Sequence, residues 1–361
     1  MSSFPKLVEA PLPRTLEAVT PTWLSEAIAA NYPGAAVTDF RTAGEIDGTA
    51  SKVRLALTYN DKGREYGLPS SVWLKGGFEG RAFGNAATFV AEAKFFADWA
   101  PLLPINIPKA YYAGIDPTGE QGLVIIEDLD LRAATYGRST NPLTLDQAAA
   151  VLDVRAQGHA ALWESPKIAN LRSYADRFAG ANHWIAEMTK PGVYEHWLDT
   201  PRFMHVPKEL HDPHTYAAGM TALYGFSAQG AQTFNQGDSH VGNVFFEADG
   251  RAGILDWQAY IRCNGMVDIA YFLIGAITIA DRGKHERDLL KGYLEALKKY
   301  GVKAPPSFDE AWLAYRRFAL HGFAWTMTTP EFHPEDVIQA YAERYGAAAE
   351  ELETLKALGV C

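Results

Sequence analysis

Cysteine is almost absent from this sequence of 361 residues, which has only Cys263 and Cys361. Two cysteines are too few for a disulfide framework or for a zinc site built from thiolates. Long apolar runs are also missing, since the longest, 269–280, falls short of the roughly 18 to 20 residues that span a bilayer. The opening MSSFPKLVEAPLPRT has no apolar stretch like that of a signal peptide. We therefore expect a cytoplasmic protein with reduced cysteines and no membrane insertion.

The sequence has fewer basic residues than acidic ones. Lys and Arg number 33 against 43 Asp and Glu, which gives a formal net charge of −10. Binding to nucleic acid independently of its sequence depends on basic surface, so we expect no nucleic-acid partner. A local basic pocket for phosphates remains compatible with this charge. The chain is long and 48% hydrophobic, which provides for a large core and favours two lobes.

The first third of the chain is rich in strand patterns. Apolar and polar residues alternate in VTDFRTAGE, SKVRLALTYN and SSVWLKGGF, and two more strands are indicated before residue 129. Residues 85–103 have the pattern of a helix. We predict an antiparallel sheet of about five strands with one inserted helix over residues 36–129. The proline-rich residues 1–20 are predicted to be an arm, followed by a short helix over 20–35.

Beyond residue 130 the pattern becomes helical. We therefore predict two domains, a β-rich lobe over 1–129 and a mainly helical lobe over 130–361, with a hinge near 127–131. Residues 165–230 are predicted to be helical and are dense in aromatic side chains. Further helices are predicted over 144–165, 266–302, 307–327 and 333–358.

One segment of the helical part, 235–258, is instead typical of a β-hairpin, with a turn at Ala248-Asp249-Gly250. It carries Asp238, Asn243 and Asp256 at or beside its ends, although carboxylates are poor strand formers. Phosphoryl transfer needs a carboxylate to orient the attacking hydroxyl and oxygen ligands for magnesium. In kinase catalytic loops the base Asp precedes a metal-binding Asn by five positions, as Asp238 precedes Asn243. A hairpin would bring its two ends to one side, where Asp256 could join them.

Several motifs resemble a known family. GDSHVGN, GILDWQ and MVDIAYF are similar to motifs of the aminoglycoside phosphotransferase and choline-kinase superfamily, and the wider pattern most resembles its ecdysteroid-kinase-like branch of small-molecule phosphotransferases. The resemblance implies an α+β, bilobal, protein-kinase-like fold, with a small antiparallel β lobe and a larger helical lobe carrying the catalytic hairpin.

The same resemblance implies a nucleotide site in the β lobe. SSVWLK looks like the strand with the nucleotide lysine, Lys75, and FVAEAKFF like the helix whose glutamate, Glu92, pairs with it. GLVIIEDL resembles the hinge strand that meets adenine, which makes Glu127 and Leu129 candidates. The loop GEIDGTAS has glycines for sharp turns and hydroxyls that could bind phosphate. Its candidate nucleotide-binding residues are Gly48, Thr49, Ala50 and Ser51.

These motifs together predict an ATP-dependent O-phosphotransferase acting on a small-molecule alcohol, with GTP open as the nucleotide. Asp238 would be the catalytic base, and Asn243 and Asp256 would hold Mg²⁺. The resemblance leaves the acceptor open among sterols, choline-like alcohols, aminoglycosides and hydroxyacyl thioesters, and the aromatic residues of 165–230 favour an apolar alcohol. The alternative class is a non-catalytic, nucleotide-binding pseudokinase. The oligomeric state is not determined by the sequence.

Residues around the motif modify this prediction. The family often has His two positions before the catalytic Asp, where this chain has Gln236, which can hydrogen-bond but carries no positive charge. His240 could line the phosphate site or bond the loop backbone, and we expect the latter. For His159, in AQGHAALWE, we expect a packing role that braces the loop. Asp268 is expected to cap the following helix or to anchor the hairpin.

Overall fold

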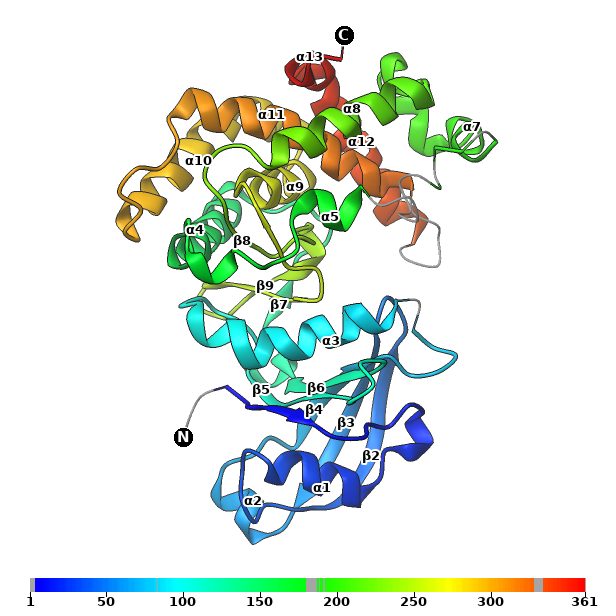
Figure 1. Cartoon of the computed structure of the whole chain (residues 1–361), viewed down its shortest axis with the longest axis vertical. Helices are drawn as coiled ribbons and strands as arrows, with labels where there is room; N and C mark the ends of the chain where they lie inside the picture. Colours follow the sequence, from blue (N-terminus) through cyan, green and yellow to red (C-terminus); the bar gives the residue numbers. More distant parts are fainter. Residues whose placement is uncertain are drawn as a thin grey trace. The chain divides into compact units, whose positions relative to one another are not determined.

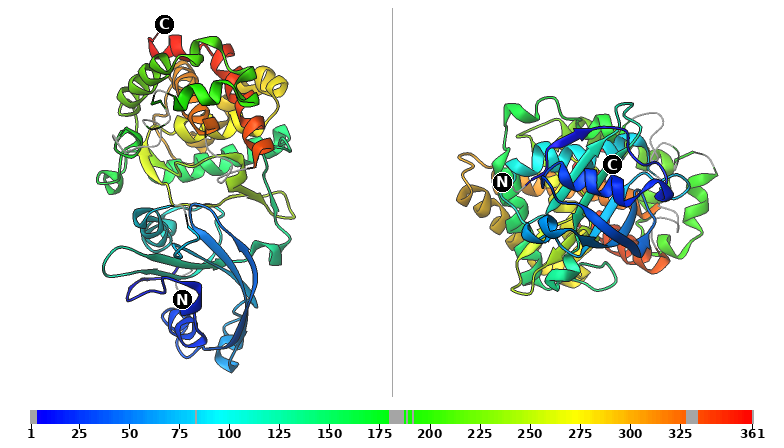
Figure 2. Two further views of the ribbon diagram at one scale, coloured as in Figure 1. Left: turned by 90° about the vertical axis from the view of Figure 1, so that its right-hand side faces the viewer. Right: turned by 90° about the horizontal axis from the view of Figure 1, so that it is seen from below.

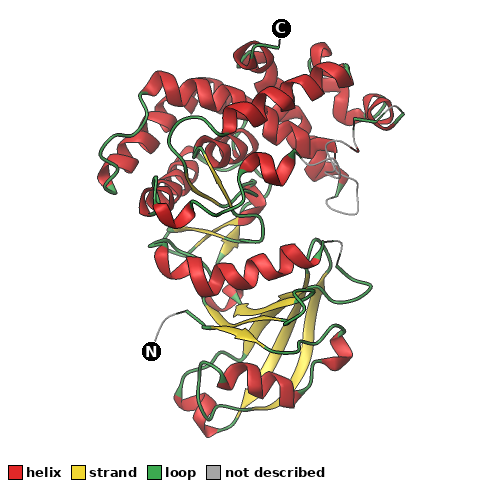
Figure 3. Cartoon of the chain, viewed as in Figure 1, coloured by secondary structure: helices red, strands yellow, loops and turns green. Residues whose placement is uncertain are grey.

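The computed structural model describes residues 4–82, 84–179, 187, 189–190, 192–327 and 334–360. The chain forms two compact units, one rich in strands and the other mainly helical (Figures 1 and 3). The first comprises Met1–Thr135 and Ile254–Ala259, and the second comprises Tyr136–Gly253 and Tyr260–Cys361. The chain thus changes unit near residue 135, whereas the sequence prediction places its boundary between residues 129 and 130.

The first unit is built on a six-stranded sheet. Its strands are β1 (Leu7–Glu9), β2 (Val37–Ile46), β3 (Ser51–Tyr59), β4 (Ser71–Gly76), β5 (Ala110–Ile115) and β6 (Gly122–Glu127). Its helices include α1 (Pro21–Ala29), α2 (Asp61–Glu65) and α3 (Ala86–Lys94). After α3 the chain continues as a π-helical turn (Phe95–Trp99) and a 3₁₀ turn (Ala100–Leu102). The strand order is β1-β5-β6-β4-β3-β2.

Two sequence predictions for this unit need correction. The sheet has a sixth strand, because Leu7–Glu9 in the predicted arm pairs in parallel with β5 while the other pairings are antiparallel. A strand of three residues is too short to show an alternating pattern. The sequence also predicts a turn at Asp61-Lys62-Gly63, between the strands SKVRLALTYN and SSVWLKGGF, but α2 begins there and is capped by the side chain of Asn60.

The alternation along β3 and β4 gives the sheet two different faces. Val53 and Leu74 point into an apolar core that also contains side chains of α1. Lys52 and Lys75 are cross-strand partners on the opposite face, where α3 packs. Figures 1 and 2 show α1 and α3 on opposite sides of the sheet. Strand periodicity therefore places two lysines beside the helix that carries Glu92.

The second unit is mainly helical. Its helices include α4 (Leu145–Ala161), α5 (Tyr174–Phe178), α7 (Val193–Leu198), α8 (Pro213–Ser227), α9 (Met266–Ala276), α10 (Ile279–Lys299), α11 (Phe308–Ala324), α12 (Glu335–Glu351) and α13 (Thr354–Leu358). Short strands accompany them: β7 (Thr135–Tyr136), β8 (Thr233–Asn235), β9 (Val244–Phe246), β10 (Ala252–Ile254) and β11 (Ile261–Cys263). β9 and β10 are adjacent in one sheet, as the hairpin prediction requires, and β8 pairs with β11 in another. No helix in the described ranges has both the length and the apolar character needed to cross a bilayer.

The segment 266–302, predicted to be helical, forms two helices, α9 and α10. Thr278 interrupts the run by accepting a hydrogen bond from the backbone N–H of Asp281, which caps α10. Every residue of α9 is buried, and the helix packs on α11 and α12. The break lets the mainly apolar α9 lie inside the unit while the amphipathic α10 runs along its surface.

The aromatic residues of 165–230 lie mostly in this core. The buried ones are Tyr174, Phe178, Tyr194, Trp197, Phe203 and Tyr216, and Tyr224 and Phe226 pack against them. Trp184 lies outside the described residues. The aromatic density of this segment is therefore explained by packing between helices.

The burial of α9 leads to a stability prediction. Leu273→Ala should lower the free energy of unfolding by about 2–5 kcal/mol, because Leu273 is fully buried and truncation leaves a cavity. Met204, which is 77% exposed, provides the matched control. Met204→Ala should change the free energy of unfolding by less than about 0.5 kcal/mol. Chemical denaturation of both variants is the measurement. Equal effects in the two variants would contradict the placement of α9 in the core.

Candidate active site

Lys75 lies at the centre of a buried ion-pair cluster in the first unit. Its Nζ is 2.8 Å from Oε1 of Glu92 on α3 and 2.8 Å from Oδ1 of Asp256. Lys52 on β3 reaches the other oxygen of Asp256 at 3.3 Å. The structure thus joins Lys75 to Glu92, as the sequence predicts, and adds Asp256 to the pair.

Asp256 is held on the first unit by its neighbours. The Trp257 ring stacks on Phe95 with centroids 4.3 Å apart and planes inclined by 3°. The backbone N–H of Ile254 donates to the carbonyl of Asn106 at 3.0 Å. Asp256 itself has φ +55°, a left-handed conformation that Asp tolerates better than most residues. Such conformations persist where surrounding contacts fix them, as the two lysines and the stacked ring do here.

The cluster places two ammonium groups against two carboxylates. Burial alone would lower the pKa of Lys75, but the charges of Asp256 and Glu92 raise it well above its usual range. Burial would likewise raise the pKa of Asp256, yet the two lysines hold it well below its ordinary value. Burial raises the pKa of Glu92, and the charge of Lys75 offsets this only in part. Lys75 and Asp256 therefore stay charged near neutral pH.

The loop Gly48–Ser51 joins β2 to β3 on the same unit. The backbone N–H of Gly84 donates to the carbonyl of Thr49 at 2.8 Å, and Gly48 forms a bridge with Ala82. The Oγ of Ser51 is buried and has no hydrogen-bond partner within the described ranges. A buried hydroxyl without a partner is costly, and a phosphate oxygen is one group that could satisfy it.

The predicted hinge residues lie at the end of β6 and just after it. Glu127 ends the strand and pairs with Nε of Arg132 at 3.2 Å, and Leu129 is buried at the start of a short 3₁₀ turn. Between them, the buried carboxylate of Asp128 accepts from Nε of Arg54 at 2.7 Å. This ion pair fixes the segment to β3.

The segment with Asp238 and Asn243 belongs to the second unit. It follows β8, and Gly237 has φ +80°, which favours glycine. The backbone N–H groups of Gln236 and Gly237 donate to the buried carboxylate of Asp268 at 2.8 and 3.0 Å. The Nδ2 of Asn243 donates to the carbonyl of Asp238 at 2.8 Å. This bond closes the loop and leaves the Asn243 amide oxygen as the atom suited to a metal.

Arg155 on α4 provides a cation beside the neutral Gln236. The buried guanidinium donates to Oε1 of Gln236 at 3.1 Å and to the carbonyl of Ser239 at 3.3 Å. It also lies 3.4 Å from Asp268. A buried cation on α4 thus lies beside the position where this chain has the neutral Gln236.

Both histidines hold the loop in place. His159 lies 3.4 Å from Asp268 through Nε2 and 2.8 Å from the Tyr293 hydroxyl through Nδ1. The Nδ1 of His240 accepts from the backbone N–H of Gly242 at 3.1 Å, which directs Nε2 toward Asp238 at 3.9 Å. These contacts fit the structural roles expected for both residues.

Some residues of the site were missed in the sequence. Lys52 alternates with Arg54 in SKVRL, so the strand pattern places it on the face of Lys75. Arg155 lies four positions before His159, a spacing that puts both on one side of a helix. The contact of Arg155 with Gln236 had no local signal, because 81 residues separate them.

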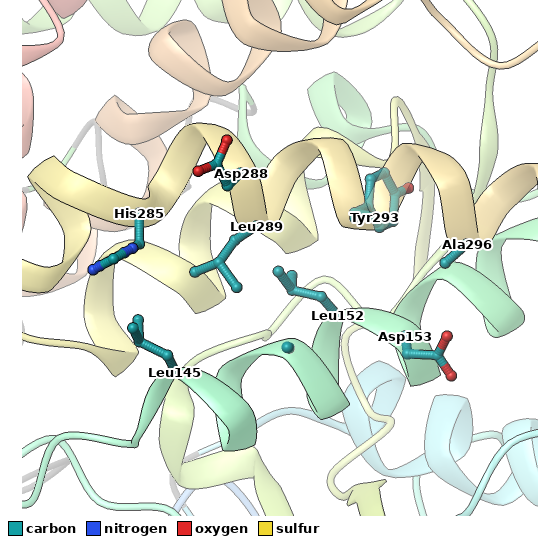
Figure 4. Close-up of a pocket in the computed structure, with 10 residues that line it drawn as sticks. Leu145, Leu152, Asp153, His285, Asp288, Leu289, Tyr293 and Ala296 are labelled. Carbon is teal, nitrogen blue, oxygen red and sulfur yellow. The ribbon is translucent and has the colours of Figure 1, made fainter.

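A cavity of about 460 Å³ lies elsewhere in the second unit, between α4 and α10 (Figure 4). Leu145, Leu152 and Leu289 line it, and none of the predicted site residues does. No cluster of three or more metal-ligating His, Cys, Asp or Glu occurs among the described residues.

The burial of Asp268 leads to a prediction about pH. Burial would raise its pKa, but the His159 hydrogen bond and the Arg155 charge lower it to about 2. The pKa of Asp in an unfolded chain is about 3.9. This carboxylate should therefore add about 2–3 kcal/mol to the free energy of unfolding above roughly pH 4, and this contribution should be lost toward pH 2. The difference in free energy of unfolding between wild type and Asp268→Asn should shrink on acidification.

Denaturation at a series of pH values measures this. Asp288→Asn, at an exposed pair with Lys291, is the control and should leave the pH dependence nearly unchanged. A difference between wild type and Asp268→Asn that is constant from pH 7 to 3 would contradict the prediction.

Both the sequence and the fold are similar to those of known proteins. The model of the ecdysteroid kinase-like family matches residues 54–303, more than two thirds of the chain. Curated protein sequences give no match. Among solved structures, the microcompartment-associated aminopropanol kinase is similar at 13% identity and a TM-score of 0.52, over 94% of this chain and 99% of that one.

Two further structures are similar at lower scores. Choline kinase LicA from Streptococcus pneumoniae has 12% identity and a TM-score of 0.46, over 92% of this chain and 98% of that chain. The GDP complex of aminoglycoside 2'-phosphotransferase-IIIa has 11% identity and a TM-score of 0.48, over 92% and 100%. The protein-kinase-like fold predicted from the sequence is confirmed. The extent of the family match confirms the predicted resemblance as well, and the chain belongs to the ecdysteroid kinase-like family.

Proposed function

We propose that the protein is an ATP-dependent O-phosphotransferase that phosphorylates a hydroxyl of a small molecule. The observation that carries this proposal is the buried Lys75, held between Glu92 and Asp256 on the strand-rich unit. A buried lysine with a fixed position and a raised pKa provides a permanent cation for nucleotide phosphates. Membership in a family of small-molecule kinases supports the reaction class.

The first unit would bind the nucleotide. Lys75 would contact the phosphates, while Glu92 keeps the ammonium group oriented. The Gly48–Ser51 loop would bind phosphate oxygens, and the unpartnered hydroxyl of Ser51 fits that role. Glu127, the last residue of β6, and Leu129, at the start of the following 3₁₀ turn, are proposed to meet the base.

Asn243 and Asp256 would hold Mg²⁺, because amide and carboxylate oxygens are the hard ligands that this ion prefers. The ion would neutralise charge that develops on the phosphates. The bond from Asn243 to the Asp238 carbonyl orients the amide, and the left-handed conformation of Asp256 fixes its carboxylate. Both donors are thus positioned by the chain itself.

Asp238 would orient the acceptor hydroxyl and accept its proton. Its side chain is 26% exposed, so a substrate can reach it. The backbone on both sides is fixed, by Asp268 before it and by Asn243 after it, which limits the movement of the carboxylate. The aromatic residues of 165–230 pack in the core, so their number does not favour an apolar acceptor.

The role of Asp238 predicts a kinetic effect. Asp238→Asn should lower kcat by about 10²–10⁴-fold and leave nucleotide affinity unchanged, because the amide cannot accept the proton. ADP release with a panel of alcohols is the assay, and Asp249→Asn in the exposed hairpin turn is the control. Unchanged kcat in Asp238→Asn would remove the base from this position. Nucleotide binding without turnover of any alcohol would favour the pseudokinase alternative.

The role of Asp256 predicts a different effect. Asp256→Ala should abolish the magnesium-dependent part of nucleotide binding, whereas Asp238→Ala should retain it, since only Asp256 is proposed as a ligand. Calorimetric titration with ATP, with and without magnesium, and with GTP in parallel, measures both. Intact magnesium-dependent binding in both variants would exclude Asp256 from the metal site.

A further inference from the structure

Three arginines lie on elements joined to the loop that carries Asp238. Arg262 is in β11, where it pairs with Phe234 of β8, the strand that leads into the loop. The backbone N–H of Arg262 donates to the carbonyl of Arg172 at 2.9 Å. Arg172 immediately precedes the cap of α5, the helix that carries Arg177. Backbone pairing thus fixes these three positions near one another in the second unit.

These guanidinium groups lack the ion pairs that are usual elsewhere in the chain. Arg202, for example, is paired with Glu335 at 2.6 Å. In the part of the chain that the structure describes, no carboxylate lies within salt-bridge distance of Arg172, Arg177 or Arg262. The Nε atoms of Arg177 and Arg262 are buried and have no hydrogen-bond partner there. Two buried donors of the same kind are left unsatisfied in one region.

Asp176 interacts with two of these arginines. Its carboxylate accepts from the Ser173 hydroxyl at 2.7 Å and from the Ser173 backbone N–H at 3.2 Å, as part of the cap of α5. These bonds lower the pKa of Asp176, and the charges of Arg172 and Arg262 lower it further. The charges of Arg172 and Arg262 thus act on a carboxylate already committed to a cap, in a protein whose net charge is negative.

Arg177 also interacts electrostatically with Asp238, the proposed catalytic base. Burial lowers the pKa of its guanidinium, and the charge of Asp238 opposes this effect. A half-buried cation without a hydrogen-bonded counter-charge costs stability, so its retention calls for a compensating role. The nearby charge of Arg172 is also positive and lowers the pKa of Arg177 further.

We propose that Arg177, with Arg172 and Arg262, binds an anionic group, a carboxylate or a phosphate, on the acceptor whose hydroxyl meets Asp238. This inference rests on the proposed phosphotransferase function and adds the chemical class of the acceptor. Guanidinium groups bind both anions through paired hydrogen bonds, which would satisfy the two buried Nε donors. The same charges disfavour a cationic amino sugar or choline as the acceptor.

The first test compares matched alcohols in an ADP-release assay. Glycerol 3-phosphate is compared with glycerol, and 3-hydroxybutyrate with 1,3-butanediol, which separates phosphate from carboxylate. Wild type should prefer at least one anionic member. Arg177→Gln should raise KM for that member about 10- to 100-fold and affect KM for its neutral partner far less, and Arg177→Lys should restore part of the loss. Preference for the neutral members, or an unchanged KM in Arg177→Gln, would overturn the proposal.

Arg287→Gln is the matched control, because Arg287 lies over the rings of Phe308 and Trp312 and touches no residue of the proposed site. It should leave both KM values unchanged. If it raises KM for the anionic member as much as Arg177→Gln does, the effect comes from overall charge and the proposal fails.

The second test is independent of turnover. Inorganic phosphate, with ADP present to fill the nucleotide site, should raise the thermal midpoint of wild type and not that of Arg177→Gln. Without phosphate, Arg177→Gln should melt at the same temperature as wild type or higher, because an uncompensated buried charge is removed. A lower midpoint with an unchanged phosphate effect would make Arg177 merely structural and overturn the proposal. Loss of the phosphate effect without turnover of any alcohol would support the anion site and contradict the proposed function.

Discussion

The carboxylate of Asp268 is the constraint on which the proposed catalytic loop depends. It is buried and receives two backbone N–H groups, a histidine and an arginine. Inside a protein such a network is strong when every member is satisfied and costly when one is lost. The loop therefore has one defined conformation, with Gly237 in the left-handed region where its N–H can reach the carboxylate. The position of Asp238 follows from this anchor.

The two units differ in their electrostatics. In the first, Lys52 and Lys75 are matched by Glu92 and Asp256, so the cluster is neutral and can stay buried. In the second, the arginines beside α5 exceed the nearby acids and leave buried donors unsatisfied. A neutral cluster stabilises the fold, whereas an uncompensated one costs stability and is typical of positions kept for binding.

The features that could be predicted from the sequence are those set by residues close together in the chain. The spacing of Asp238 and Asn243 and the strand pattern around Lys75 are local, and they led to the fold and the candidate residues. Strand β1 was missed because it has three residues and pairs with β5 about a hundred positions away. The contacts of Arg155 and Lys52 depend on how distant elements pack, which no local pattern encodes.

The segment Ile254–Ala259 belongs to the first unit although the chain has by then crossed into the second. The strand-rich unit is thus discontinuous in sequence, and three peptide connections join it to its neighbour. A fragment ending at Thr135 would lack Asp256 and Trp257, which would leave Lys52 and Lys75 with Glu92 alone and uncover the ring of Phe95. The strand-rich unit is therefore completed by a segment more than a hundred positions further along the chain. A truncation at one position cannot produce the whole unit as a separate domain.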